Sequence, residues 1–147
     1  MGRITFLIVD DSPVWRRIIR KFVEEKLKGI VVAEASDGLE AINLYNKLKP
    51  NVVTMDIEMP ELDGIRAMEE ILRYDKNAKI IVISSKGEED TVRKALLKGA
   101  KDFIVKDLET EKWLKRFENV IKNDETKNSK NTFFDNIRRY IDRFKRR

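Results

Sequence analysis

The sequence predicts an α/β fold, a doubly wound parallel sheet of five strands with helices on both faces. Five short apolar runs alternate with segments in which apolar residues recur every three or four positions. The runs are apolar at nearly every position, which is typical of strands that are buried on both sides. Regular alternation of strand and helix implies parallel strands joined by right-handed crossovers.

The first half of the chain contains two strands and two helices with clear start signals. Strands are expected at 4–9 and 30–35. Ser12, followed by proline, is an N-cap candidate for the first helix. Asp37 and Glu40 form a capping-box-like pair at the start of the second helix. The buried face of the first helix is expected to carry Val14, Trp15, Ile18, Ile19, Phe22, Val23 and Leu27.

Three further strands are expected at 52–55, 80–83 and 103–105, each followed by a helix. Asp63, before a glycine, is interpreted as a turn residue ahead of the third helix. Gly99 is expected to stop the fourth helix. The last helix carries the apolar residues Trp113, Leu114, Phe117, Val120 and Ile121.

Polar side chains follow four of these strands, where the strands end: Asp10, Asp11, Asp56, Ser84 and Lys106. The carboxyl ends of parallel strands form one edge of a sheet, so these side chains are expected to converge. Three carboxylates alone would repel, which implies a bound cation such as Mg²⁺ with oxygen ligands. The lysine and the hydroxyl are then placed to hold a phosphoryl group.

The composition excludes several kinds of chemistry. With no histidine and no cysteine among 147 residues, the chain has no Ser-His-Asp triad, thiolate nucleophile, histidine phosphocarrier or His/Cys zinc site. A phosphoryl group on an aspartate must therefore come from another molecule. No apolar stretch approaches the ~20 residues of a membrane span, and no signal sequence is evident, so a cytoplasmic location is expected.

The polar strand ends, with Met-Asp-Ile-Glu-Met-Pro-x-x-Asp-Gly at 55–64, resemble the response-regulator receiver family in its stand-alone, CheY-like form. The resemblance spans residues 3–122. It implies a flavodoxin-like fold with the strand order 2-1-3-4-5 known for this family. It also implies a phosphoacceptor signalling protein of a two-component phosphorelay, which catalyses only its own phosphorylation and dephosphorylation.

By this resemblance Asp56 is the nucleophile, which takes a phosphoryl group from a sensor histidine kinase or phosphotransfer protein. Mg²⁺ would be bound by the Asp11 and Asp56 carboxylates and the Glu58 backbone carbonyl, with Asp10 acting through a water. Lys106 would pair with the phosphoryl group.

The resemblance also implies a switch, in which Ser84 moves toward the phosphoryl group and Phe103 fills the vacated space. The face formed by the fourth helix, fifth strand and fifth helix would then bind a downstream protein. Glu58 and Lys86 occupy positions that tune dephosphorylation, and they are expected to pair. Asp107 replaces the proline usual after Lys106; because a cis bond before a non-proline residue costs ~2.5–4 kcal/mol, a trans bond is expected.

Residues 1–123 are assigned to the receiver domain and 124–147 to a polar linker and a basic amphipathic helix. This tail has eight basic and four acidic residues and so carries most of the net charge of +5. It is too short for a DNA-binding domain. Protein docking or dimerisation ranks first for its role, then lipid binding, then nucleic-acid binding.

Two alternative functions remain, a scaffold and a less favoured phosphatase, and a third, a flavodoxin-type carrier, is discarded. A phosphorylation-independent, receiver-like scaffold could act through the C-terminal helix. A Mg²⁺-dependent aspartyl phosphatase of the dehalogenase type would need Asp-x-Asp, where this chain has adjacent aspartates. A flavodoxin-type cofactor carrier would need a hydroxyl-rich loop, where this chain has Asp11-Ser12-Pro13.

Overall fold

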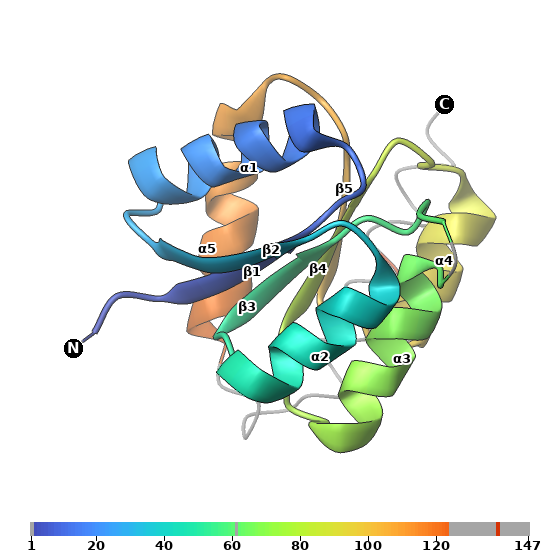
Figure 1. Cartoon of the computed structure of the whole chain (residues 1–147). Helices are drawn as coiled ribbons and strands as arrows, with labels where there is room; N and C mark the ends of the chain where they lie inside the picture. The colour runs from blue at the N-terminus through green and yellow to red at the C-terminus, as the bar shows by residue number, and fades with distance from the viewer. Residues whose placement is uncertain (1, 61, 124–137, 139–147) are drawn as a thin grey trace.

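The computed structural model describes residues 2–60, 62–123 and 138 (Figure 1). Within them, five parallel strands form one sheet in the order β2-β1-β3-β4-β5, which confirms the predicted class and strand order. The strands are β1 (Thr5–Val9), β2 (Ile30–Ala35), β3 (Val52–Met55), β4 (Ile80–Ser84) and β5 (Asp102–Val105). The helices are α1 (Pro13–Glu25), α2 (Gly38–Leu48), α3 (Gly64–Tyr74), α4 (Glu89–Leu97) and α5 (Leu114–Lys122), with a 3₁₀ turn, η1 (Thr110–Trp113).

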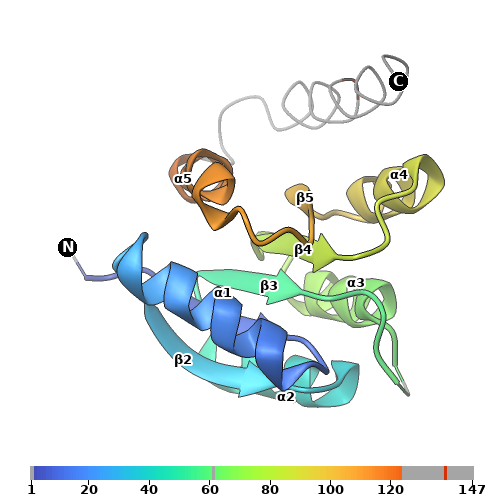
Figure 2. The same ribbon diagram turned by 90° about the horizontal axis from the view of Figure 1, so that it is seen from above.

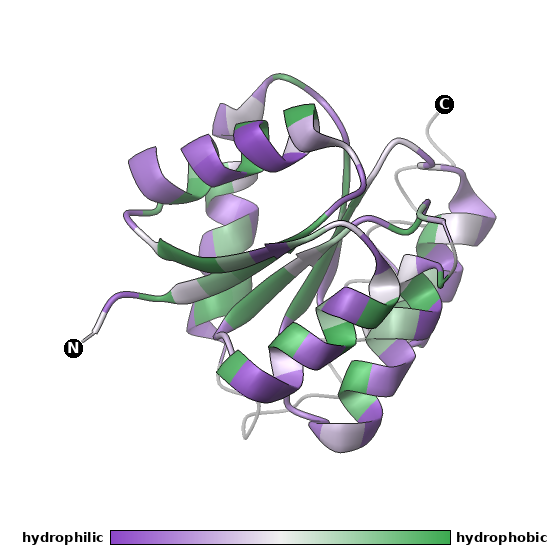
Figure 3. Cartoon of the chain, viewed as in Figure 1, coloured by the Kyte–Doolittle hydropathy of each residue, from purple (hydrophilic) through white to green (hydrophobic). Residues whose placement is uncertain are grey.

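Helices cover both faces of the sheet and enclose two cores (Figures 1 and 2). The α2–α4 core lies between the sheet and α2, α3 and α4, and includes Met68, Ile71 and Phe103. The α1–α5 core lies on the other face and includes Phe22 and Phe117, whose ring centroids are 5.0 Å apart. Figure 3 shows apolar strands between helices that carry hydrophilic residues on their outer sides. Each strand thus contributes alternate side chains to the two cores.

Side-chain caps fix where α1, α2 and α3 begin. The Ser12 hydroxyl accepts a hydrogen bond from the Trp15 N–H at 3.2 Å, and Asp37 accepts one from the Glu40 N–H at 2.8 Å. Both predicted starts are confirmed. Asp63, interpreted as a turn residue, instead caps α3 by accepting from the Arg66 N–H at 2.9 Å.

Two other boundaries bear on the prediction. Gly99 follows α4 with a φ of +120°, a conformation that favours glycine, as its expected stop position requires. The last helix begins later than expected, because Trp113 belongs to the preceding 3₁₀ turn.

The predicted linker and basic helix at 124–147 lie outside the described residues, apart from Arg138. Among the described helices, none has the length and apolar character needed to span a bilayer.

Candidate functional site at the carboxyl edge of the sheet

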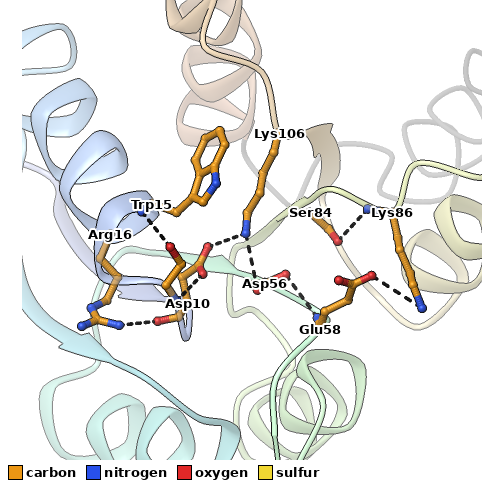
Figure 4. A network of polar contacts seen from close by, with 9 residues as sticks. Asp10, Trp15, Arg16, Asp56, Glu58, Ser84, Lys86 and Lys106 are labelled. Carbon is orange, nitrogen blue, oxygen red and sulfur yellow. Dashed lines mark hydrogen bonds and ion pairs between the residues drawn. The ribbon is translucent and has the colours of Figure 1, made fainter.

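Backbone hydrogen bonds continue just past the strand ends and fix the residues of the site. The Asp10 N–H donates to the Ala35 carbonyl at 3.0 Å, and the Asp56 N–H to the Val9 carbonyl at 2.9 Å. The Lys106 N–H donates to the Ser84 carbonyl at 2.9 Å. The predicted residues therefore lie together at one edge of the sheet, as Figure 4 shows.

Asp10, Asp11 and Asp56 form an acidic cluster, in which one carboxylate oxygen from each residue lies within 4.8 Å of the others. Asp10 and Asp56 are 0% and 3% exposed, whereas Asp11 is exposed at the mouth. Within the described residues, Asp10 Oδ2 is a buried oxygen that receives no well-aligned hydrogen bond, although Lys106 Nζ lies 3.0 Å away. Carboxylate oxygens with unused lone pairs, open to solvent on one side, fit a hard divalent cation such as Mg²⁺.

Lys106 reaches into this cluster from the end of β5. Its Nζ atom lies 3.0 Å from Asp10 Oδ2 and 3.5 Å from Asp56 Oδ2, and its side chain is only 10% exposed. The peptide bond to Asp107 is trans, as predicted, since the described residues contain no cis bond. The lysine therefore reaches the carboxylates without the proline usual at the next position.

Burial, followed by the charge of the neighbouring Asp10, raises the pKa of Asp56 from its ordinary value of 3.8 to about 6. The N–H of Glu58, which donates to Asp56 Oδ1 at 3.2 Å, and the ammonium of Lys106 act in the opposite direction. At pH 7 this pKa leaves Asp56 about nine-tenths ionised. The carboxylate is thus available as a nucleophile without a separate base.

Ser84, Glu58 and Lys86 lie on the other side of Asp56 (Figure 4). Ser84 is buried, and its hydroxyl accepts a hydrogen bond from the Lys86 N–H at 3.2 Å. Lys86 Nζ lies 3.5 Å from Glu58 Oε1, and both side chains are substantially exposed. The predicted ion pair across the mouth is therefore present.

Phe103 is fully buried in the α2–α4 core. The guanidinium of Arg116, on α5, donates to the Phe103 carbonyl at 2.7 Å and to both carboxylate oxygens of Asp102 at 2.6 and 3.0 Å. The strand that carries Phe103 is thereby joined to α5, on the opposite face of the sheet.

Three residues of α1 and its N-cap contact the site and were missed as site residues by the sequence reasoning. The Ser12 N–H donates to Asp10 Oδ1 at 2.9 Å, and Arg16 Nη1 donates to the Asp10 carbonyl at 2.7 Å. The Trp15 ring lies beside Lys106, with its centroid 5.2 Å from Nζ. Helical periodicity indicated only that Trp15 lies on a buried face, and no sequence signal pairs it with Lys106, 91 positions later.

The family model for the response regulator receiver domain matches residues 6–118. The chain belongs to the response-regulator receiver family. This receiver is 43% identical over 119 residues to the chemotaxis protein CheY of Listeria monocytogenes. The alignment covers 81% of this chain and 99% of that protein. It is 49% identical over 100 residues to CheY of Thermotoga maritima, with 68% and 82% of the two chains covered.

Solved receiver structures share the fold. The CheY chain in the CheX-CheY-BeF3-Mg+2 complex from Borrelia burgdorferi is 38% identical to this receiver, with a TM-score of 0.78 over 82% of this chain and 90% of that one. The response regulator domain of Thermotoga maritima CheB is 35% identical, with a TM-score of 0.72 over 82% and 95% of the two chains. The chain is thus a CheY-like receiver of two-component signalling, a signalling protein rather than a classical enzyme.

Proposed function

We propose that this receiver accepts a phosphoryl group on Asp56 from a phosphohistidine of a sensor histidine kinase or phosphotransfer protein. The observation that carries the proposal is the convergence of Asp10, Asp11, Asp56 and Lys106 at one edge of the sheet. Because the chain has no histidine, the phosphodonor has to be another molecule.

In the transfer, an Asp56 carboxylate oxygen forms a bond to phosphorus while the phosphorus–nitrogen bond of the donor breaks. The imidazole keeps the electron pair of that bond. Little covalent chemistry is required of the protein, since positioning and charge cancellation supply most of the catalysis of phosphoryl transfer. Lys106, whose Nζ lies 3.5 Å from Asp56 Oδ2, would pair with a phosphoryl oxygen.

The acidic cluster, together with the backbone carbonyl of Glu58, would hold Mg²⁺, Asp10 acting through a water. Bound Mg²⁺ would cancel negative charge on the phosphoryl oxygens. The buried Asp10 Oδ2, which accepts no well-aligned hydrogen bond, and the exposure of Asp11 support this assignment. Asp56 then has two tasks, cation ligand and nucleophile, one for each carboxylate oxygen.

Phosphorylation would switch the face formed by α4, β5 and α5, which binds a downstream protein. The Ser84 hydroxyl would exchange its bond from the Lys86 N–H for one that it donates to a phosphoryl oxygen. Phe103 packs in the α2–α4 core. Its ring would fill the space that Ser84 vacates, as the family resemblance implies. The response is a population shift between two packings of β5 and its neighbouring helices.

The Glu58–Lys86 ion pair would slow dephosphorylation. The two exposed side chains lie across the mouth of the site, where a water must approach to attack the aspartyl phosphate. An exposed pair contributes only ~0–1 kcal/mol, so its effect lies in obstruction rather than in stability.

The proposal is tested by incubating the protein with Mg²⁺ and acetyl phosphate and measuring the intact mass. We expect a gain of one phosphoryl group that requires Mg²⁺ and is absent in Asp56→Asn. Beryllofluoride binding, followed by tryptophan fluorescence, serves as a control that does not depend on phosphate lifetime. Failure of both would favour a phosphorylation-independent scaffold, with Asp107 as the first residue to exchange for proline.

A further inference from the structure

The ammonium of Lys106 lies between charged and aromatic partners. Two carboxylates contact Nζ at 3.0 and 3.5 Å, and the Trp15 ring faces it with its centroid 5.2 Å away (Figure 4). A cation within about 6 Å of a ring centroid is attracted to the face of the ring, and tryptophan gives the strongest attraction of the aromatic side chains. The side chain is only 10% exposed, so water screens this contact weakly.

The position of the Trp15 backbone is set by the same aspartate that pairs with Lys106. Asp10 Oδ1 accepts from the Ser12 N–H at 2.9 Å, and the Ser12 hydroxyl accepts from the Trp15 N–H at 3.2 Å. Asp10 Oδ2 contacts Lys106 Nζ, and the Trp15 ring contacts the same Nζ. These two contacts and the two hydrogen bonds connect Asp10, Ser12, Trp15 and Lys106 in a closed network. The start of α1 and the lysine after β5 are thereby held to one carboxylate.

A lysine at this position needs such support. Its ammonium is a point charge on a flexible four-carbon chain, which costs conformational entropy to fix. Its two carboxylate partners belong to the acidic cluster, which under the proposed function has to serve a cation as well. The Trp15 ring has no net charge and offers no ligand atom for the cation, so it can keep the ammonium in place while those carboxylates change partners.

We propose that Trp15 is a positioning residue for Lys106, which its indole ring holds at the acidic cluster by a cation–π contact. The consequence for phosphoryl transfer rests on the proposed function, whereas the contact itself does not. Trp15 acts only through Lys106, so its removal lowers the rate of transfer without removing a reacting group.

The test compares Trp15→Leu, which lacks an aromatic face, with Trp15→Phe, which keeps one. Val14→Ala is the matched control, because Val14, which was expected on the buried face of α1, is instead 61% exposed in the same helical turn. Trp15→Met replaces the leucine variant if that variant does not fold, as judged by circular dichroism. The first measurement needs no phosphodonor: the Cε protons of Lys106 are observed by NMR in protein with ¹³C-labelled lysine, and assigned by their loss in Lys106→Met.

In the wild-type protein and Val14→Ala, we expect Lys106 Cε protons that are shifted upfield by the ring and distinct from each other, as in a fixed side chain. They should remain distinct in Trp15→Phe and merge at the position of a mobile lysine in Trp15→Leu. In the second measurement, Trp15→Leu should react with acetyl phosphate about three- to tenfold more slowly, with partial rescue in Trp15→Phe.

Lys106 Cε protons that stay distinct from each other in Trp15→Leu would overturn the proposal. So would a wild-type reaction rate in that variant. If the wild-type protein takes up no phosphoryl group, the proposed function fails, and the positioning of Lys106 is still decided by the NMR comparison.

Discussion

Exchange of Asp56 for asparagine should make the protein more stable when no divalent cation is present. The wild-type carboxylate is 3% exposed and shares the acidic cluster with Asp10 and Asp11. Asparagine has nearly the same shape and can still accept the hydrogen bond from the Glu58 N–H. The substitution thus removes a buried negative charge and leaves the packing almost unchanged.

The magnitude follows from the pKa of Asp56, which rises from 3.8 to about 6 on folding. At about 1.36 kcal/mol per pKa unit, this rise corresponds to at most about 3 kcal/mol. Solvent at the open mouth screens part of it, so we expect a gain of about 1–2 kcal/mol in the free energy of unfolding at pH 7.5.

The sign of the pH dependence also follows. The pKa of Asp56 is higher in the folded state, so the folded protein binds the proton more tightly than the unfolded chain does. Protonated Asp56 therefore stabilises the wild-type fold at low pH, and this contribution to the free energy of unfolding is lost as the pH rises through 6. The advantage of Asp56→Asn should therefore be complete above about pH 6 and should vanish as the pH falls toward 4.

Urea unfolding in EDTA at several pH values between 4 and 7.5 measures this difference. Asp37→Asn is the matched control, since Asp37 is the N-cap of α2 and asparagine caps about equally well. Addition of Mg²⁺ should stabilise the wild type more than Asp56→Asn. The reasoning would be refuted if Asp56→Asn were less stable than the wild type at pH 7.5 in EDTA, or if its advantage did not change with pH.

Three further substitutions test other contacts of the site. Gly64→Ala would place a Cβ 2.0 Å from the Asp56 carbonyl oxygen, so it should lower the free energy of unfolding by about 1–3 kcal/mol and weaken Mg²⁺ binding measured by calorimetry. Gly2→Ala, with no atom within 4 Å, should change neither quantity. Ser12→Ala removes the α1 cap and should cost about 1 kcal/mol in urea unfolding, whereas Ser85→Ala, at an exposed position, should cost little. Lys86→Ala removes the ion pair with Glu58 and should speed the loss of phosphate by up to about fivefold. The loss is measured by intact mass after removal of the phosphodonor. A loss no faster than in the wild type would count against the proposal that the ion pair obstructs water.

Much of the fold and site could be predicted because local rules and topology agree. The apolar runs that became β1, β3 and β4 are short and rich in β-branched residues, which favours strands. Ser12 and Asp37 mark helix starts that the structure confirms. Asp10, Asp56, Ser84 and Lys106 could be placed together because parallel strands end at one edge. Their convergence needs only the topology, not the side-chain conformations.

The rest depends on side-chain directions and on competing local conformations. Lys106 was expected to meet a phosphoryl group, and its contact with Asp10 was not foreseen. That contact follows from burial, because a buried carboxylate needs a counter-charge. The ring of Trp15 could not be placed over the lysine, because periodicity gives a face but no rotamer. The 3₁₀ turn at Thr110–Trp113 has the apolar pattern of the helix that follows, so its tighter winding was not visible in the sequence.

The division of the interior by the sheet has a consequence for how such a protein can diversify. The residue proposed to position Lys106 and the residue expected to respond to phosphorylation belong to different cores. Trp15 packs against the α1–α5 core, and Phe103 lies in the α2–α4 core. Substitutions on opposite sides of the backbone layer share few partners, so their effects on stability should add. The α2–α4 core beneath α4 can therefore be remodelled for a new partner, while the α1–α5 core behind Lys106 is retained and, with it, the proposed phosphoryl chemistry.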